Sequence, residues 1–73
     1  MPEMSNASLE RILRNAGALR VSASAVDLMA EAMEEYGLKL SVEAVALAKH
    51  AGRKTVKRED VKLAVRRLRN GPY

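Results

Sequence analysis

The sequence predicts an all-α fold in which a short helix, a long central helix and a second short helix follow one another along the chain. Apolar residues recur at spacings of three and four through the middle, and shorter sets with the same spacing precede and follow them. Serine and glycine residues suited to helix ends separate the three segments. We expect one domain over residues 1–73, with helices at about 7–15, 23–50 and 58–69 and a frayed tail at 70–73.

The long central helix is predicted from one continuous apolar stripe. Its members stay on a single helical face, and they are Met29, Met33, Tyr36, Leu40, Ala44, Leu47 and Ala51. Gly37 lies inside this run and costs roughly 1 kcal/mol relative to alanine, but the stripe keeps its phase across it. Ser22 suits the N-cap, and Gly52 suits a left-handed position after the last turn. At about 42 Å, this helix is longer than the core of so small a chain can cover.

The second half of the central helix is apolar on two opposite faces. Leu38, Val42 and Val45 lie on the side away from the stripe, where a soluble monomer would present polar residues. A second copy of the chain is the expected cover, so these residues, with Met33 of the stripe, form the predicted dimer interface. The alternative is a monomeric three-helix bundle in which the flanking helices wrap both faces.

The two flanking helices have shorter apolar sets. Ser5 or Asn6 can cap the first helix and Gly17 ends it; its apolar set is Leu9, Ile12, Leu13 and Ala16. The third helix has acidic residues in its first turn and arginines in its last, as the helix dipole prefers. Its stripe consists of Val61, Ala64, Val65 and Leu68, and Leu63 falls outside that stripe.

Composition excludes several classes of function. With no cysteine and one histidine, the 73 residues offer neither disulfides nor the clustered ligands of a transition-metal site. The chain contains no nucleotide-binding glycine loop and no nucleophile motif, so we expect no enzyme, catalytic residue, cofactor or small-molecule substrate. It also lacks a signal peptide and any run of about 20 apolar residues, so we expect a soluble cytoplasmic protein that does not bind membranes.

Charge is strongly segregated along the sequence. Residues 23–50 carry two Lys and Arg against five Asp and Glu, whereas residues 51–73 carry eight against two. A basic C-terminal segment can be a solvated helix face, but this excess favours binding to a polyanion. Arg20 also directly precedes the predicted N-terminus of the central helix, where unpaired N–H groups favour phosphate.

Two segments closely resemble the archaeal histones. They are LERILRNAGALRVS at residues 9–22 and AKHAGRKTVKREDVKLAVRRL at residues 48–68, and the HAGRKT stretch is highly specific. The resemblance implies the histone fold, in which two chains clasp head to tail with crossed central helices. It also implies that the first loop of one chain lies beside the second loop of the partner, which creates DNA-binding surfaces at both ends of the dimer.

The resemblance also implies roles for individual residues. Arg11 matches a minor-groove arginine, and Thr55 matches the hydroxyl residue that helps to hold it. The positions that match residues near phosphates are Arg14, Arg20, Ser22, Lys54 and Lys57. Arg53 and Asp60 match a pair that braces the second loop, although Arg53 is also a candidate DNA contact. The patch that would join dimers consists of Leu47, His50, Asp60 and Leu63.

The expected function is that of an architectural chromatin protein. Such a protein binds, bends and wraps double-stranded DNA largely independently of sequence, compacts the chromosome and is associated with it in the cytoplasm. We expect a homodimer or a heterodimer with a paralogue, and tetramers or longer stacks on DNA. The alternative is a histone-fold module of the transcription-factor type that acts mainly through protein partners, which the acidic central helix would suit.

Overall fold

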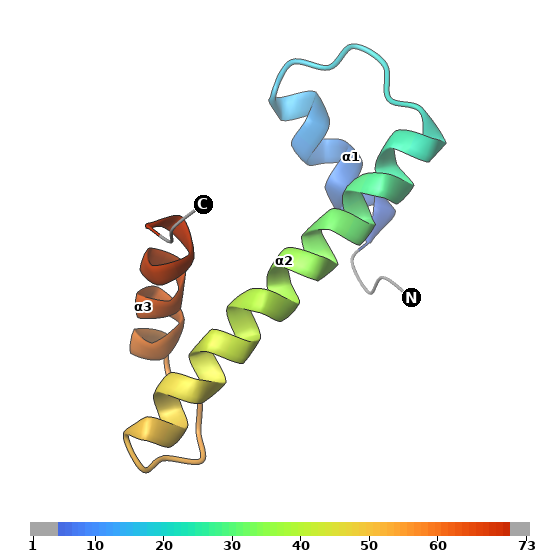
Figure 1. Ribbon diagram of the computed structural model, residues 1–73. Coiled ribbons are helices and arrows are strands. Elements are labelled where there is room, and N and C mark those ends of the chain that lie inside the picture. The colour runs from blue at the N-terminus through green and yellow to red at the C-terminus, as the bar shows by residue number, and fades with distance from the viewer. Residues whose placement is uncertain (1–4, 71–73) are drawn as a thin grey trace. The chain divides into compact units, whose positions relative to one another are not determined.

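A computed structural model of the chain describes residues 5–70. Three helices follow one another: α1 (Asn6–Asn15), α2 (Ala23–His50) and α3 (Arg58–Arg69) (Figure 1). No strand occurs among the described residues, so the all-α prediction is confirmed. The first helix begins one residue before its expected start at 7. Of the tail expected at 70–73, only Asn70 lies within the described range, where it forms the C-cap of α3.

The ends of α1 are fixed by local hydrogen bonds. The side chain of Ser5 accepts a hydrogen bond from the amide of Ser8 at 3.4 Å, so Ser5 is the N-cap. At the other end, the Gly17 amide donates to the Arg14 carbonyl at 3.0 Å and the Ala18 amide to the Leu13 carbonyl at 3.1 Å. This Schellman arrangement requires a left-handed residue after the cap, which Gly17 supplies with a φ of 115°.

The long helix α2 is capped as its sequence suggests. The Ser22 hydroxyl accepts a hydrogen bond from the Ala25 amide at 3.1 Å. Gly52 adopts a φ of 76°, and its amide donates to the Lys49 carbonyl at 2.9 Å. Gly37 stays within the helix, where the Ser41 hydroxyl donates to its carbonyl at 2.7 Å. The apolar stripe therefore outweighs the helix-breaking tendency of Gly37.

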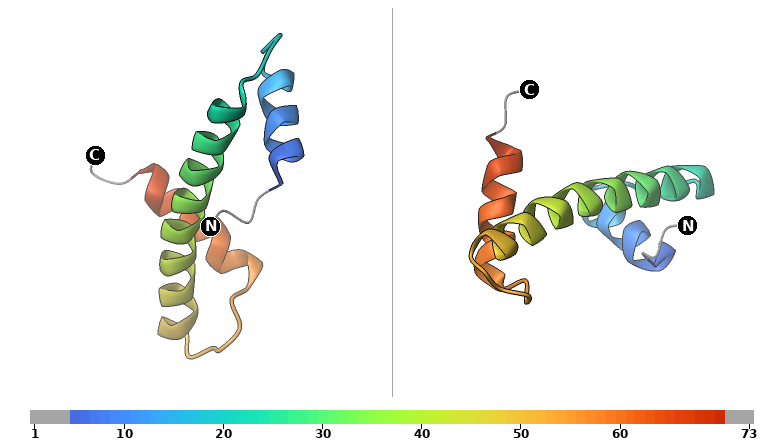
Figure 2. Two further views of the ribbon diagram at one scale, coloured as in Figure 1. Left: turned by 90° about the vertical axis from the view of Figure 1, so that its right-hand side faces the viewer. Right: turned by 60° about the horizontal axis from the view of Figure 1, so that its bottom comes forward.

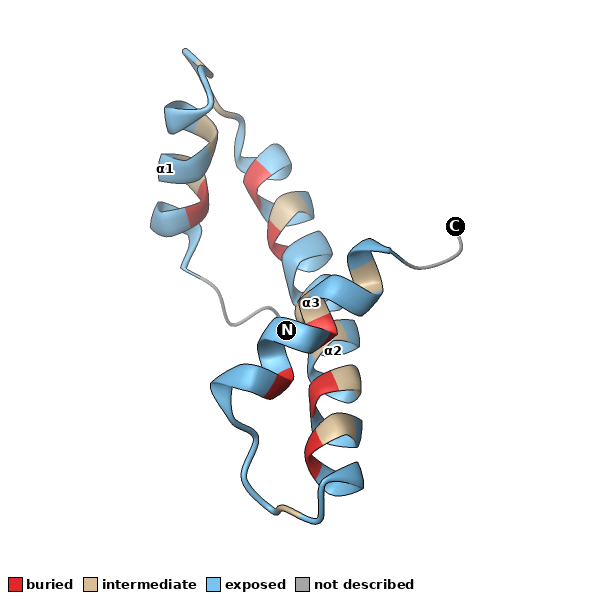
Figure 3. Ribbon diagram, turned by 90° about the vertical axis from the view of Figure 1, so that its left-hand side faces the viewer, coloured by how far each residue is buried: buried red, intermediate tan, exposed pale blue. Residues whose placement is uncertain are grey.

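The chain divides into two compact units at the boundary between Tyr36 and Gly37. In the first unit α1 packs beside the first turns of α2 and buries Leu9, Val26 and Ala30 (Figure 3). Three partly buried side chains, Leu13, Val21 and Met29, pack against this cluster. Among the described residues, Leu9 is the largest side chain that is fully buried.

In the second unit α3 packs across the C-terminal half of α2 (Figure 2). Three alanines, Ala44, Ala48 and Ala64, are buried there, together with the charged residue Asp60. The Arg67 guanidinium of α3 also donates to the Glu43 carboxylate of α2 at 2.6 Å. Small side chains thus allow the two helices to approach closely, and an ion pair joins them at the surface.

The predicted stripe of α2 is only partly covered within one chain. The first unit buries Val26, which continues the stripe three residues before Met29, and Ala30, which lies beside the stripe. Stripe residues Met33 and Tyr36 remain 36% and 45% exposed. In the second unit Ala44 of the stripe is buried, and so is Ala48, which lies outside it. The sequence pattern correctly identified an apolar face, but α1 and α3 each pack along its edge.

Candidate nucleic-acid interface

An ion pair organises the loop between α2 and α3, which comprises residues 51–57. Two nitrogens of the Arg53 guanidinium donate to the two carboxylate oxygens of Asp60, both at 2.8 Å. Arg53 Nη1 also donates to the Thr55 carbonyl at 3.0 Å, and the Lys57 amide donates to Asp60 Oδ2 at 2.8 Å. Asp60 therefore holds both the start of α3 and, through Arg53, the middle of the loop.

The Arg53–Asp60 pair is charged at neutral pH. The hydrogen bonds from Arg53, and next the hydrogen bond from the Lys57 amide, lower the pKa of Asp60 from 3.8 to about 2, although burial opposes this shift. The same hydrogen bonds with Asp60 raise the pKa of Arg53 further above neutrality, although burial opposes this shift. With Asp60 only 5% exposed, the pair is a fixed part of the loop.

The remaining predicted DNA contacts of this loop are exposed. Lys54, Thr55 and Lys57 lie at the surface on a backbone that the Arg53–Asp60 pair restrains. Arg53 itself has three hydrogen bonds within the chain. The structure thus places Arg53 as a support for the loop and its neighbours as the groups that face solvent.

The loop between α1 and α2, residues 16–22, carries the second set of predicted contacts. Arg20 and Ser22 are exposed, and the Ser22 hydroxyl caps α2. Arg14, expected near phosphate, is engaged within the chain: its guanidinium donates to the Glu10 carboxylate at 2.8 and 3.1 Å. Arg11 is exposed on α1, where it lines a shallow hollow with Ala7, Glu10 and Arg14.

The predicted contact between dimers combines residues in different environments. His50 and Leu63 are exposed, Leu47 is half-buried and Asp60 is buried. No hydrogen bond joins His50 to Asp60 within the described part of the chain. Asp60 Oδ1 accepts one hydrogen bond from Arg53 and retains a lone pair for a second donor.

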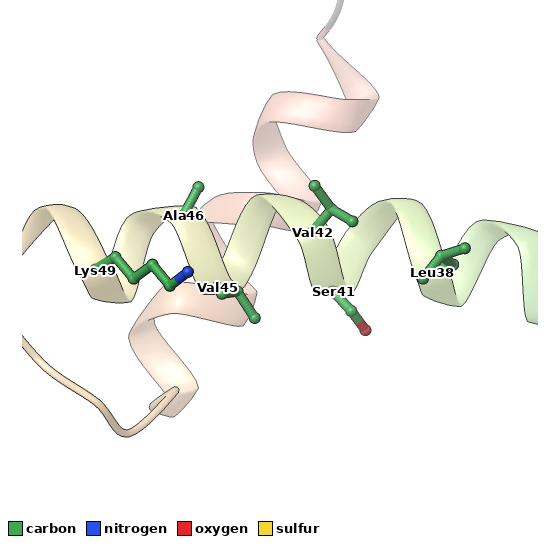
Figure 4. A pocket seen from close by; sticks show the side chains of 6 residues that line it. All are labelled: Leu38, Ser41, Val42, Val45, Ala46 and Lys49. Atoms are coloured by element: carbon green, nitrogen blue, oxygen red, sulfur yellow. The ribbon is translucent and has the colours of Figure 1, made fainter.

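The second unit presents two apolar surfaces. The first is an open face formed by α2 alone, lined by Leu38, Ser41, Val42, Val45, Ala46 and Lys49 (Figure 4). The second is a groove between α2 and the segment from the loop into α3, lined by Leu40, Ser41, Ala44, Val45, Val56 and Val61. Leu38 and Val42 are 65% and 64% exposed, and Val45 lines both surfaces.

Two ion pairs were not identified from the sequence. Glu10 and Arg14 are four residues apart on one helix, and this spacing was a usable signal. Glu43 and Arg67 are 24 residues apart, so their contact depends on the packing of α3 against α2. Within residues 5–70, no group of three or more His, Asp or Glu side chains could hold a metal ion. Nor is any helix there long and apolar enough to cross a membrane.

Both loops carry exposed cations, and the small core of this all-α chain leaves apolar surfaces open. These features are typical of a protein that self-associates and binds a polyanion. The sequence profile described as histone-like transcription factor (CBF/NF-Y) and archaeal histone matches residues 2–65. One subunit of the archaeal histone HAN1 from Thermococcus zilligii is 50% identical over 66 residues, which cover 90% of this chain and 98% of that protein. The probable archaeal histone 3 of Methanocaldococcus jannaschii is 54% identical, with the same coverage. The chain belongs to the family of archaeal histones and histone-like transcription factors.

Proposed function

We propose that this chain is an architectural protein of chromatin that binds, bends and wraps double-stranded DNA largely independently of sequence. The observation that carries the proposal is the loop at residues 51–57, where exposed Lys54, Thr55 and Lys57 are held by the Arg53–Asp60 pair. Membership of the histone family supports a structural role on DNA over catalysis. No cofactor is part of the proposal, and the site of action is the chromosome in the cytoplasm.

DNA contacts come from both loops of a head-to-tail dimer. Arg20 and Ser22 of one chain lie beside Lys54, Thr55 and Lys57 of the partner and face phosphates. Arg11 enters the minor groove, where sequence affects groove width and bending more than hydrogen-bonding pattern. Such a surface reads the shape of the duplex and its charge, which accounts for weak dependence on sequence.

The dimer covers the apolar surfaces that one chain leaves open. Its interface includes Leu38, Val42 and Val45 together with Met33, and these residues are exposed in the single chain. Eleven large apolar side chains are exposed among the described residues, whereas only six apolar residues are buried, so burial by a second copy is strongly favoured. The partner is an identical chain or a paralogue. The second possibility is supported by the Thermococcus zilligii relative, whose name describes it as one subunit of a histone.

Dimers join on DNA through Leu47, His50, Asp60 and Leu63. Leu63 lies off the buried face of α3 and is exposed, and the remaining lone pair of Asp60 Oδ1 is available to a histidine donor from another dimer. Tetramers or longer stacks would extend the wrapped length of DNA.

Binding measured as a function of salt tests the proposal. If each dimer neutralises about 6 to 10 phosphates, affinity for any duplex falls by roughly 10³ to 10⁵ between about 50 and 200 mM salt. Two duplexes of unrelated sequence should show similar slopes. A nearly flat dependence would instead support the module that acts through protein partners.

A further inference from the structure

The guanidinium of Arg14 connects α1 to the following loop. Nε and Nη2 donate to Glu10 Oε2 at 3.1 and 2.8 Å, and Nη1 donates to the Leu19 carbonyl at 3.3 Å. All three contacts use one planar group, so the Glu10 carboxylate sets the orientation in which Arg14 reaches the loop.

The Leu19 carbonyl lies where the loop has few other restraints. Hydrogen bonds of the α1 C-terminus end at Ala18, and those of the α2 N-terminus begin at Ser22. Within the described part of the chain, the bond from Arg14 is the only hydrogen bond to the backbone of residues 19–21. The Leu19 side chain is 91% exposed, so packing of that side chain does not fix the backbone beneath it. Val21 is half-buried against the core and anchors the end of the segment.

We propose that Glu10 and Arg14 form a brace that positions the loop at residues 16–22 for DNA, so that Arg14 acts through Arg20 and does not itself contact phosphate. This inference rests on the proposed DNA-binding function and assigns Glu10 a role in it. Arg14 bonds the backbone of the residue directly before Arg20, and Arg20 is exposed. Arg53 supports the other loop in the same manner, through one carboxylate and one loop carbonyl.

The brace predicts that removing the acid Glu10 weakens DNA binding, the opposite of what loss of a negative charge usually does. Glu10 lies beside Arg11 and Arg14 on a basic surface, so simple electrostatics predicts that Glu10→Ala strengthens DNA binding. If Glu10 orients Arg14, its removal loosens the loop and weakens binding. The pair is largely exposed, with side chains 44% and 52% accessible, so the change is moderate. We expect a loss of about threefold per dimer, in line with two weak surface contacts.

The decisive experiment measures the affinity of the full-length dimer for one short duplex, sized for a single dimer, across a salt series. Glu10→Ala, Arg14→Ala and Arg14→Lys should each weaken binding by about threefold, because lysine keeps the charge but lacks the planar fork. The double variant Glu10→Ala/Arg14→Ala should bind like either single variant, because both residues act through the same contact with the Leu19 carbonyl. The slope of log affinity against log salt should stay at its unsubstituted value, because no phosphate contact is removed.

Glu35→Ala is the matched control. It removes an exposed acid for which no ion pair is found among the described residues, and it should leave affinity unchanged or slightly higher. Amide hydrogen exchange adds a second readout: residues 19–21 should exchange faster in the brace variants, with α1 protected as before.

Three results would overturn the brace. Glu10→Ala could bind as tightly as the unsubstituted protein or more tightly. Arg14→Ala could reduce the salt slope by about 1.8, the value for two lost phosphate contacts per dimer. Arg14→Lys could bind normally, as a phosphate contact would allow. In all three cases the unsubstituted protein still binds duplex DNA, whereas failure of that protein to bind would refute the proposed function itself.

Discussion

The guanidinium of Arg53 meets both oxygens of the Asp60 carboxylate at 2.8 Å, and Asp60 in turn accepts the Lys57 amide at the start of α3. One buried acid therefore fixes a loop and a helix end together. Asp60→Asn removes the negative charge and replaces one acceptor oxygen with an NH2 donor, so it cannot keep all three hydrogen bonds. It should therefore lower the thermal midpoint more than Glu59→Gln. Glu59 is an exposed acid in the same helical turn. Equal midpoints for the two variants would show that the pair contributes little to the fold.

The same pair predicts how stability depends on pH. Because the pKa of Asp60 is lowered to about 2 in the folded chain, its contribution is present above its ordinary value of 3.8. That contribution is lost progressively as the pH falls from 3.8 toward 2, since the unfolded chain takes up the proton first. Unfolding followed at several pH values should show this loss, and Asp60→Asn should reduce it. If the stability of Asp60→Asn falls with pH in parallel with that of the unsubstituted protein, Asp60 is not the group responsible for the loss.

Folding should be coupled to dimer formation, since Val45 lines two apolar surfaces that one chain leaves open. The midpoint of unfolding should rise with protein concentration. In a monomer Val45→Asp would be tolerated, because Val45 is 39% exposed, but in a dimer it would bury a carboxylate among apolar groups. Little folded Val45→Asp protein should remain, whereas Lys39→Asp, at an exposed position of the same helix, should fold. A concentration-independent midpoint with a monomeric mass in sedimentation would refute the dimer.

Removing a phosphate contact should weaken binding equally on every DNA sequence. Arg20→Ala and Lys54→Ala each remove two contacts per dimer, so each should lower affinity for all duplexes and reduce the salt slope by about 1.8. Arg11→Ala should instead reduce the preference for easily bent duplexes over stiff ones, if this side chain enters the minor groove. Competition binding with a panel of duplexes measures both effects. A loss confined to one sequence for Arg20→Ala or Lys54→Ala would argue for base recognition.

Assembly beyond the dimer should depend on Leu63. It is exposed on α3 beside Glu59, Lys62 and Arg66, so a glutamate can replace it without disturbing the buried face. Leu63→Glu should keep the mass and midpoint of the dimer yet shorten nuclease-protected DNA to the footprint of one dimer. Unchanged protected lengths for Leu63→Glu, at normal dimer stability, would show that Leu63 does not join dimers.

The order of the helices and their caps could be predicted from the sequence because those signals are local. Spacing revealed α2 across Gly37, and Ser22, Gly17 and Gly52 act at the expected helix ends. Burial was harder to predict, because whether Ala48 or Leu40 is covered depends on how α3 packs against α2. The same holds for the contact between Glu43 and Arg67, which no local pattern encodes.

Only part of the candidate site could be predicted from the sequence, for a similar reason. The exposed cations Arg20, Lys54 and Lys57 followed from charge segregation and from the resemblance. The engagement of Arg14 with Glu10 and the Leu19 carbonyl required three-dimensional positions, because residue type alone does not distinguish a phosphate contact from a loop support.

Nuclease digestion of DNA reconstituted with the pure protein tests the central claim most directly. If dimers wrap duplex DNA and join through their outer patches, digestion should leave a ladder of regularly spaced protected lengths. Omitting the protein provides the baseline, and Leu63→Glu should collapse the ladder to its shortest band. Uniform digestion at saturating protein, with no protected length above the baseline, would contradict wrapping and favour a module that acts through protein partners.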